Sequence, residues 1–453
     1  MRRYVERLHQ STRPESIGRD REDTGNSEFR KNTLAGAIAV TLLGFMGSAA
    51  AVVNIQCPGT INADPNGNLV VPVQSAQHPN AKCASLIAGD SFTVMSDGEP
   101  MYIFGFGNQT GTAEADLIDN GILDAEFSGP TIELEEGDEF WLNLTNVGTV
   151  MRPDLFDPHT VHWHGFPNAA TVFDGVPEVS IAINMGGTLT YYYNVVEPGT
   201  YLYHCHVEAT EHMEMGMLAN LYVHPAQDRT GCTGATPCPV ATRGGGNASD
   251  APTGYTYNDN DGTTAWDVEK ALQVSSFDND FHDADLFVQP LPFAMLQGNY
   301  PMINGRGYPD TVTPGPLPAP RDDASGKVTG TPGELLNNGT STQKLDSTIS
   351  VNQGERLLLR LSNVGLDRFW TLTAPGLKMR IVGTGAKQMR GVDGKNIYRT
   401  TTSVNFGGGE THDVIIDTAG IEPGTYFLHA TELHQMSNRT QFDGGMITEI
   451  VVN

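Results

Sequence analysis

The sequence predicts an all-β protein built from two β-sandwich domains of similar plan. One observation is the composition: 453 residues hold 51 glycines and 27 prolines, and no long amphipathic helical pattern stands out. The other is an internal repeat of strand-like runs. The chain is long enough for two or three domains of ordinary size.

The repeat has two parts. Residues 129–148 contain an alternating strand, a glycine turn and a second alternating strand, and residues 348–365 repeat that order. Later, residues 197–204 (EPGTYLYH) match residues 422–429 (EPGTYFLH). Two sandwiches with the same order of strands therefore follow.

The boundaries of these domains come from the composition between the repeats. We expect the first domain over 54–225, a linker rich in Gly, Thr, Asn and Asp over 226–265, and the second domain over 266–453. A second loop-like stretch over 309–345, rich in Pro, Gly and Asp, lies inside the second domain.

The N-terminus combines a polar leader over 1–32 with an apolar, uncharged segment over 33–53. Arg30 and Lys31 precede the apolar core, and small residues follow at 48–51, as in a secretory signal. The segment is also long enough to span a bilayer as an uncleaved anchor. A cleaved signal peptide and a membrane anchor both stay open, and either exports the protein to the periplasm or the extracellular space.

The charge excludes two classes of partner. The formal net charge is −26 at pH 7, so the protein has no electrostatic attraction for nucleic acid. The same charge repels anionic membrane surfaces, so we expect membrane contact only through an uncleaved N-terminal segment.

Four of the five cysteines are candidates for disulfide bonds in an oxidising compartment. Local pairing, Cys57 with Cys83 and Cys232 with Cys238, is the simplest of three connectivities. Free thiols are the alternative. The fifth cysteine, Cys205, belongs to a metal-binding pattern.

That pattern collects six of the thirteen histidines in two short stretches. They are His159-Thr160-Val161-His162-Trp163-His164-Gly165 and His204-Cys205-His206, the latter followed by His212 and Met217. Histidine, thiolate and thioether are the ligands that copper prefers, and two histidines, a cysteine and a weak axial methionine form a blue-copper site. Burying this set without a metal would be costly. The neighbouring Met213 and Met215 are expected to pack in the core, and the alternative is that they hold additional copper.

Strand periodicity sorts the ligands into two clusters. Because alternate residues of a strand face opposite sides, Cys205 should point away from its two histidine neighbours. His159 should likewise point away from His162 and His164, provided that Pro158 does not bend the strand. The expected clusters are His159, Cys205, His212 and Met217 on one side and His162, His164, His204 and His206 on the other. Cys205 is bonded through the backbone to the second cluster, which predicts a covalent route for electrons.

These motifs resemble the multicopper oxidases, the laccase-like family, and the resemblance covers roughly residues 90–225 and 266–453. It implies two cupredoxin-like Greek-key β-sandwich domains and copper as the cofactor. It implies type 1 copper at His159, Cys205, His212 and Met217, type 2 copper at His162 and type 3 copper at His164, His204 and His206. His212 follows Cys205 by seven residues, where the family usually has five.

The family also has an aspartate that hydrogen-bonds water at the second cluster. The run Asp174-Gly175-Val176-Pro177 matches that motif, which implies Asp174 as a candidate proton donor. The other interpretation is that Asp174 caps a turn before Gly175.

The second domain departs from the family pattern. By alignment of the repeats, Thr371 and Thr373 stand at the positions of His162 and His164, and Arg368 at that of His159. His429, Ala430 and Thr431 replace His204, Cys205 and His206. We therefore expect no blue copper in this domain, and the number of copper ions at the second cluster stays open.

The resemblance implies a homotrimer in which another subunit's second domain closes the second cluster. His429 and His434 are the candidate ligands across that interface; otherwise they are ordinary surface or interface histidines. His282, in an acidic stretch that we expect to be a loop, and His412 are expected not to be ligands.

The leading hypothesis is a copper-dependent oxidoreductase. Electrons from a small reducing substrate, a metal ion or a protein donor would pass through type 1 copper to the histidine-rich site, where oxygen is reduced. One alternative is a copper nitrite reductase, a family that lacks the His162-x-His164 pair and the second histidine of the His-Cys-His run. The other is a non-enzymatic blue-copper electron-transfer or copper-binding protein. Copper stoichiometry and oxygen uptake separate the three.

Overall fold

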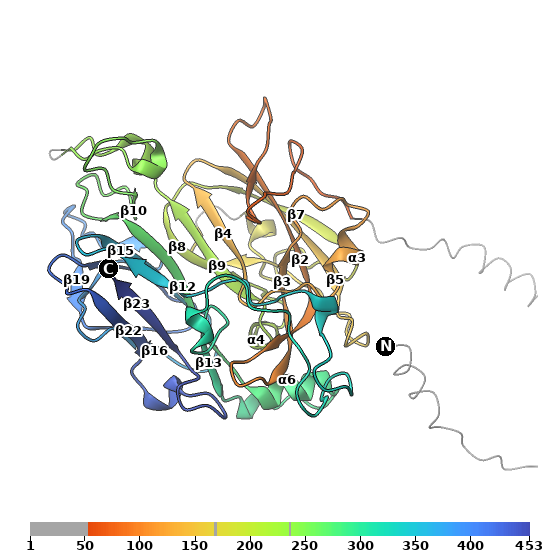
Figure 1. Cartoon of the computed structure of the whole chain (residues 1–453). Helices are drawn as coiled ribbons and strands as arrows, with labels where there is room; N and C mark the ends of the chain where they lie inside the picture. The colour runs from red at the N-terminus through yellow and green to blue at the C-terminus, as the bar shows by residue number, and fades with distance from the viewer. Residues whose placement is uncertain (1–52, 167–169, 235–236) are drawn as a thin grey trace, which may run out of the picture. The chain divides into compact units, whose positions relative to one another are not determined.

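Strands dominate the structure, which confirms the all-β prediction. The computed structural model describes residues 53–166, 170–234 and 237–453 (Figure 1). The predicted leader and all but the last residue of the apolar segment over 33–53 lie outside this part of the chain. None of the described helices is long and apolar enough to cross a membrane.

The first sandwich consists of two sheets. One has the order β1-β2-β5-β7, with β3 paired to β2, and the other has the order β4-β9-β8-β6. The strands are β1 (Val71–Pro72), β2 (Ala81–Val94), β3 (Pro100–Asn108), β4 (Gly129–Glu135), β5 (Glu139–Gly148), β6 (His162–Trp163), β7 (Thr188–Asn194), β8 (Gly199–His204) and β9 (Leu218–His224). Leu142 and Tyr191 of one sheet share a buried core with Tyr203 and Leu221 of the other, so the sheets pack face to face.

The second sandwich repeats this plan. Its sheets have the orders β13-β12-β15-β21-β17-β18, with β19 paired to β17, and β14-β23-β22-β16-β20. The strands are β12 (Val268–Phe277), β13 (Tyr300–Ile303), β14 (Ile349–Val351), β15 (Arg356–Asn363), β16 (Trp370–Thr373), β17 (Met379–Thr384), β18 (Lys387–Gln388), β19 (Arg399–Thr401), β20 (Ser403–Phe406), β21 (Thr411–Asp417), β22 (Gly424–Ala430) and β23 (Ile447–Val452). β12 runs parallel to β15 as β2 runs parallel to β5, and β14 to β23 as β4 to β9.

Helices are short. The α-helices are α3 (Leu117–Gly121), α4 (Ala209–Glu214), α5 (Gln227–Thr230) and α6 (Asn279–Leu286). The 3-10 helices are η1 (Thr171–Phe173), η2 (Thr242–Gly244), η3 (Phe293–Met295), η4 (Asp310–Val312), η5 (Asn337–Gly339) and η6 (Leu433–Met436). The predicted loop-like stretch over 309–345 contains η4 and η5 and no strand.

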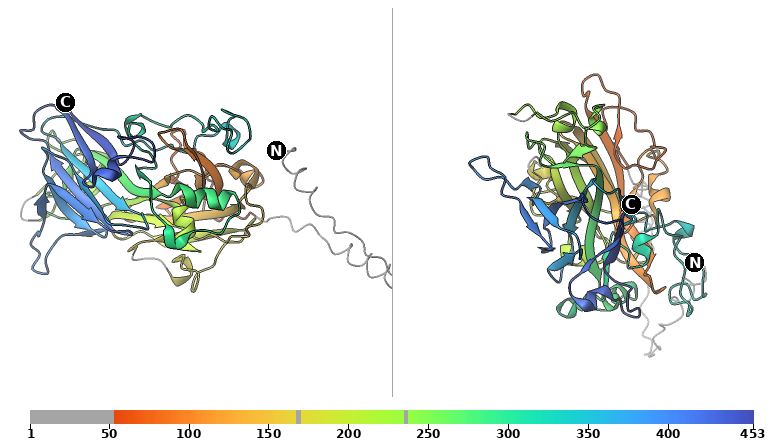
Figure 2. Two further views of the ribbon diagram at one scale, coloured as in Figure 1. Left: turned by 90° about the horizontal axis from the view of Figure 1, so that it is seen from below. Right: turned by 60° about the vertical axis from the view of Figure 1, so that its left-hand side comes forward.

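The two sandwiches lie side by side (Figures 1 and 2), and β15 and β21 of the second contact β8 of the first. Alternation along β15 explains one part of this contact. Leu357 and Leu359 enter the second core, whereas Arg360 faces the other way and donates to Thr200 Oγ1 of β8 at 3.0 Å. Thr200 Oγ1 in turn donates to Asp413 of β21 at 2.5 Å. Buried polar groups therefore join the domains.

Helix α6 reaches from the second sandwich back to the first. Asp278 caps the helix by accepting a hydrogen bond from the Asp280 amide, which explains why it begins there. Phe281 enters the first core, and His282 is fully buried on this helix rather than in the loop that we expected. This helix lies beside α4, which carries His212 (Figure 1).

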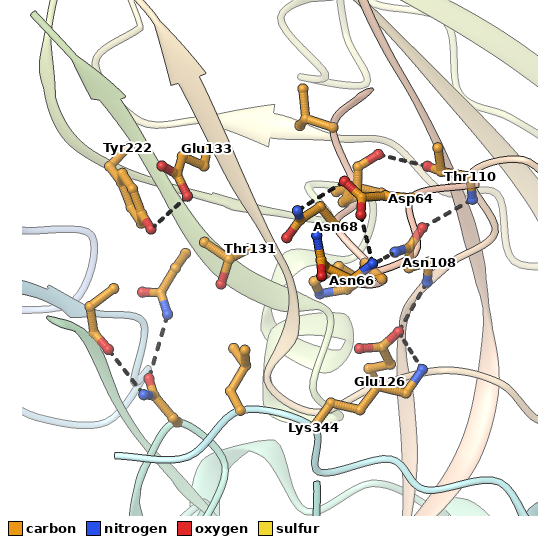
Figure 3. A pocket seen from close by; sticks show the side chains of 18 of the residues that line it. Asp64, Asn66, Asn68, Asn108, Thr110, Glu126, Thr131, Glu133, Tyr222 and Lys344 are labelled. Atoms are coloured by element: carbon orange, nitrogen blue, oxygen red, sulfur yellow. Dashed lines mark hydrogen bonds and ion pairs between the residues drawn. The ribbon is translucent and has the colours of Figure 1, made fainter. Parts of the chain in front are cut away.

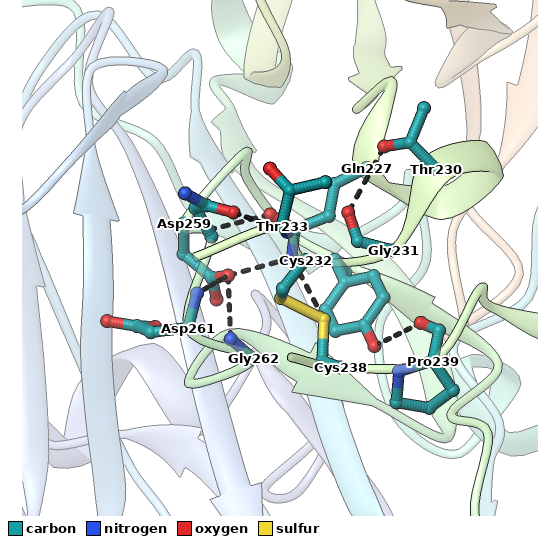
Figure 4. Close-up of a disulfide and its surroundings, with 12 residues drawn as sticks. Gln227, Thr230, Gly231, Cys232, Thr233, Cys238, Pro239, Asp259, Asp261 and Gly262 are labelled. Carbon is teal, nitrogen blue, oxygen red and sulfur yellow. Dashed lines mark hydrogen bonds between the residues drawn. A yellow bond between two sulfur atoms is a disulfide. The ribbon is translucent and has the colours of Figure 1, made fainter. Parts of the chain in front are cut away.

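The segment over 226–265 contains α5, η2 and the hairpin of β10 (Gly254–Tyr255) and β11 (Ala265–Trp266). The bond between Cys232 and Cys238 closes a small loop here, and the Gln227 amide donates to Asp259 across it at 2.7 Å (Figure 4). With the bond between Cys57 and Cys83, the predicted local disulfide pairing is confirmed. The exact domain boundaries stay a prediction.

Candidate metal centre

The first cluster forms around a buried thiol. Cys205 follows the last residue of β8, and its Sγ lies 3.3 Å from His212 Nδ1 and 3.9 Å from His159 Nδ1. All three side chains are at most 1% exposed. Their donor atoms lie within 4.8 Å of one another. Two imidazole nitrogens around one buried sulfur form the donor set of a blue-copper site.

Met217 is brought to this cluster by the main chain. Its amide donates to the His212 carbonyl at 2.9 Å, and its carbonyl accepts from the Cys205 amide at 3.1 Å. The side chain is fully buried in the same apolar core as Cys205. Met213 and Met215 are also buried among apolar side chains, as expected.

Burial and charge act on the two histidines of this cluster in opposite ways. Burial, reinforced by His212, holds the pKa of His159 well below its usual value, so this ring is neutral. Burial alone would also lower the pKa of His212. The Cys205 sulfur and the Asp157 carboxylate raise that pKa to about 10, because both favour a cation at this position. A bound metal cation would satisfy the same demand for positive charge.

The second cluster lies on the other side of the same strand end. The donor atoms of His162, His164 and His204 lie within 4.8 Å of one another. Register explains part of this arrangement, since His162 of β6 is paired directly with His204 of β8. His164 Nε2 lies 2.9 Å from His204 Nε2.

Three main-chain carbonyls fix the orientation of these rings. His162 Nδ1 donates to Asp174 O at 2.6 Å and His204 Nδ1 donates to Cys205 O at 2.7 Å. His164 Nδ1 donates to Gly409 O, in the second sandwich, at 3.1 Å. In neutral rings the protons are then on Nδ1, and the Nε2 atoms carry lone pairs.

This arrangement fits a bound metal ion. Two lone pairs that face each other at 2.9 Å repel unless a cation lies between or beside them. Burial is the main cause that lowers the pKa of His204, and neighbouring histidines lower it further, so protonating the rings is costly. Neutral imidazoles suit copper, and carbonyl-held Nδ1 atoms are typical of metal-ligating histidines.

His206 lies at the edge of this cluster. Its ring centroid is 4.9 Å from that of His162, and its amide donates to Thr160 Oγ1 at 3.2 Å. It is not part of the tight group of three. His204 and His206 thus approach the second cluster while Cys205, between them, belongs to the first, which is the separation that strand parity predicts.

Asp174 contacts the second cluster mainly through its carbonyl. Its carboxylate Oδ1 is 3.9 Å from His162 Nδ1, and the side chain is 37% exposed. Asp174 also ends η1, with its amide bonded to Thr171 O. Both interpretations of this residue therefore agree with its position.

The second sandwich has a histidine in the position of His204. His429 Nδ1 donates to Ala430 O at 2.8 Å, as His204 does to Cys205 O. The alignment of the neighbouring strand was wrong by two residues. The register pairs Thr373 with His429 as it pairs His162 with His204, so Thr373 rather than Thr371 corresponds to His162.

The same shift removes Arg368 from the position of His159, which Trp370 takes instead. Arg368 contacts His434, whose Nε2 lies 3.2 Å from a guanidinium nitrogen of Arg368. The His434 side chain is 66% exposed and lies on η6. His429 and His434 do not join the two clusters within this chain.

His282 and His412 lie apart from both groups of donor atoms. Both ring nitrogens of His282 face main-chain carbonyls, of Tyr102 at 2.6 Å and Glu214 at 3.0 Å. Burial is the main cause that lowers its pKa, to about 4. His412 of β21 packs against Phe406.

A polar pocket of about 990 Å³ lies between the two sandwiches, away from the histidines. Figure 3 shows Tyr222 donating to Glu133 on one wall and Lys344 paired with Glu126 on another. None of the lining residues belongs to either cluster. The two clusters are therefore separate from this cavity, the first fully buried and the second partly buried.

Comparison with known proteins agrees with the geometry. Two family models, both described as multicopper oxidase, match residues 118–228 and 312–453. An L-ascorbate oxidase of Cucumis sativus is 34% identical over 123 residues, 25% of this chain and 19% of that protein. Laccase-12 of Arabidopsis thaliana is 24% identical over 328 residues, 72% of this chain and 45% of that protein. The chain thus spans less than half the length of these relatives.

Solved structures show the same fold. A blue copper oxidase from Nitrosomonas europaea matches with a TM-score of 0.54 and 22% identity, over 81% of this chain and 85% of that chain. Another multicopper oxidase matches with a TM-score of 0.51 and 16% identity, over 89% and 96%. These structures show the fold, and the two family models, which together cover more than half of the chain, show that the chain belongs to the multicopper oxidase family.

Proposed function

We propose that this chain is a copper-dependent oxidase that passes electrons from a reducing substrate to oxygen. The family implies copper as the cofactor, and both donor clusters fit that metal. The observation that carries the proposal is the run His204-Cys205-His206. Its cysteine faces one cluster and its histidines approach the other.

We assign the ligands as follows. Type 1 copper is held by His159, Cys205, His212 and Met217, type 2 by His162, and type 3 by His164, His204 and His206. Because His162, His164 and His204 converge closely, their assignment is better supported than that of His206.

When bound, copper would supply one-electron redox chemistry at the first site and a centre for oxygen reduction at the second. The protein supplies geometry. Burial of Cys205 and His212 keeps water from the first site. The Nδ1–carbonyl bonds leave the Nε2 atoms of the second site free to bind a metal, and those of His164 and His204 face each other at 2.9 Å. The backbone from His204 to His206 would give electrons a covalent route between the two sites.

Asp174 is our candidate for moving protons to the second site. Its carboxylate lies close to His162 and is partly exposed to solvent, so it contacts both the cluster and bulk water. Asp174→Asn should slow turnover while copper content and the blue band stay as in the wild type. Unchanged turnover would leave Asp174 as a turn cap only.

Electrons should enter at the edge of His212. The ring nitrogen that faces away from Cys205, Nε2, lies 3.7 Å from Asp157 Oδ2. Glu208 adds a second carboxylate within 4.8 Å. These groups favour a reducing substrate that is cationic or donates hydrogen bonds, whether it is a small molecule, a metal ion or a protein.

The central test is copper stoichiometry combined with oxygen uptake. The wild type should bind more than one copper per chain, show an intense blue band and consume oxygen with a reductant. Cys205→Ser should abolish the blue band, because the thiolate–copper bond causes it. One blue copper without a second-site signal would identify a carrier, and nitrite reduction without oxygen uptake would identify a nitrite reductase.

We further propose that the active form is a homotrimer in which His429 or His434 of one subunit faces the second cluster of the next. The orientation of His429, with Nδ1 bonded to Ala430 O, matches that of His204 and leaves Nε2 available. The exposed side chain of His434 supports its role as the other candidate.

Replacing His429 and His434 together by alanine should lower second-site copper and turnover and leave the blue band intact. His78→Ala is a matched control, since His78 is a half-exposed histidine that pairs with Glu139 in the first domain. Sedimentation should give three chains per particle. Full copper occupancy in the double variant, or a monomer with full activity, would contradict the trimer.

We also propose that the protein works outside the cytoplasm, in the periplasm or the extracellular medium. The two disulfides support an oxidising compartment. N-terminal sequencing of the mature protein distinguishes a cleaved signal from an anchor. A mature chain that begins after residue 48 indicates cleavage, and an intact N-terminus in a membrane fraction indicates an anchor held by residues 33–53.

A further inference from the structure

A glycine turn of the second sandwich touches a proposed ligand of the first. Residues 407–410 (GGGE) connect β20 to β21, and the Gly409 carbonyl accepts the hydrogen bond from His164 Nδ1 at 3.1 Å. The carbonyls that orient His162 and His204 belong to Asp174 and Cys205, in the same sandwich as the cluster. His164 is thus oriented by the other domain of the same chain.

The turn is held rigidly. The Glu410 amide donates to Gly407 O at 3.1 Å, and the Gly407 amide donates to the Glu410 carboxylate at 2.6 Å. The Gly409 amide donates to Asn363 O at 2.8 Å. The Asn363 side chain in turn donates to Phe406 O at 2.9 Å, directly before the turn. These bonds fix the direction of the Gly409 carbonyl.

The strand that follows the turn is fixed to the strand that carries His204. Thr411 Oγ1 donates to Thr200 O at 2.7 Å, so β21 lies along β8. The hairpin of β17 and β18 adds a second contact, because a side chain at Gly199 would meet Ala386 atoms at 2.7 to 3.0 Å. The distance from Gly409 to His164 is therefore set by the packing of the two sandwiches.

Position 409 can hold only glycine without disturbing His164. Its φ is +81°, in the left-handed region that residues with a Cβ rarely adopt. A Cβ added there would lie 2.7 Å from His164 Cε1 and 2.8 Å from His164 Nδ1. Any side chain would push the imidazole ring away from the carbonyl that holds it.

We propose that Gly409 is a positioning residue for the second metal cluster. Its carbonyl keeps the proton of His164 on Nδ1 and so directs the lone pair of Nε2 at His204. The second sandwich has Thr373 where the first has His162, and it acts on the cluster in the same chain through its backbone. The inference rests on the proposed copper function, and its test separates the two.

The test compares Gly409→Ala with Gly420→Ala. Gly420 is a matched control because it lies in the same domain with φ +75° and nothing within 4 Å of an added Cβ. Both variants carry the same backbone penalty, and only the first contacts a histidine. Copper affinity at each site is measured by titrating copper into metal-free protein, following the blue band and total copper.

Gly409→Ala should weaken copper binding at the second site by about 10–100-fold, the usual effect of losing a group that orients a ligand. The blue band should keep its wild-type intensity, and Gly420→Ala should stay within about twofold of wild type at both sites. In metal-free protein, ¹⁵N spectra of labelled histidine should report His164 as the Nδ1-protonated tautomer in the wild type and in Gly420→Ala, and not in Gly409→Ala.

A second variant keeps the inference testable if Gly409→Ala does not fold. Glu410→Ala removes the acceptor for the Gly407 amide without touching His164, so it should loosen the turn and give a smaller loss at the second site. Second-site affinity in Gly409→Ala equal to that of Gly420→Ala would overturn the inference and leave the copper function standing. A selective loss in a protein that never consumes oxygen would support the inference and refute the oxidase.

Discussion

Glu269→Gln tests how strongly buried charges join the two sandwiches. Arg360 is fully buried, and its Nε donates to Glu269 Oε1 at 2.5 Å. The other side of Glu269 accepts from His224 Nε2 at 2.9 Å. The substitution keeps the shape of the side chain and removes its charge. It leaves Arg360 with Asp413 as its remaining carboxylate partner, at 3.3 Å.

The expected loss is about 3 kcal/mol of unfolding free energy, at the low end for breaking a buried ion pair, because one carboxylate partner remains. With an unfolding entropy of about 2 cal/mol/K per residue over about 400 residues, this loss lowers Tm by about 4 °C. Differential scanning calorimetry at pH 7 measures it. Glu422→Gln is the control, since Glu422 is exposed, and it should shift Tm by less than about 1 °C.

The direction in which this stability difference changes with pH follows from the pKa of Glu269. Burial alone would raise the pKa of Glu269, but Arg360 and His224 outweigh it and hold that pKa well below its usual value. A depressed carboxyl pKa contributes stability that is complete above the unfolded value of about 4.5 and is lost as the pH falls toward the folded value. The Tm gap between wild type and Glu269→Gln should therefore narrow below about pH 4.5. Equal Tm values at pH 7, or a gap that stays constant down to pH 3, would refute the reasoning.

Two further predictions concern the axial methionine and the disulfides. Met217→Leu should keep the blue colour and raise the reduction potential of the first site, because a weak axial donor is lost. Redox titration of the blue band measures that potential, and an unchanged or lower value would exclude Met217 as the axial ligand. Breaking the bond between Cys57 and Cys83, which are 26 residues apart, should cost about 3.5 kcal/mol. Breaking the bond between Cys232 and Cys238, 6 residues apart, should cost about 2 kcal/mol. Urea unfolding of the two double-alanine variants gives the order, and a reversed order would contradict the loop-length argument.

Local features of the site could be predicted from the sequence. The separation of Cys205 from its histidine neighbours follows from strand geometry alone, and the disulfides join cysteines that are close in the chain. The matching EPGTY runs indicated the repeated sandwich because they mark equivalent strands. In each case the sequence distance is short or the periodicity is strict.

Features that depend on packing between distant segments could not be predicted. The repeat alignment placed Thr371 opposite the wrong histidine position, because spacing between strands differs in the two copies and only register settles it. The return of α6 to the first sandwich was missed, although Asp278 before an acidic run was a usable capping signal. The contact between Gly409 and His164 spans 245 residues. Three consecutive glycines were its only trace in the sequence.

The run His204-Cys205-His206 also limits how such a protein can change. Because consecutive residues at the end of β8 face the two different sites, inserting or deleting a residue there would turn the thiol toward the histidines and break both sites at once. Length changes are tolerable only beyond this run. The two additional residues before His212 obey that limit, since they fall in the turn and helix α4 that follow. The spacing of the two metal sites is therefore fixed in whole residues, whereas the loops around them are free to vary.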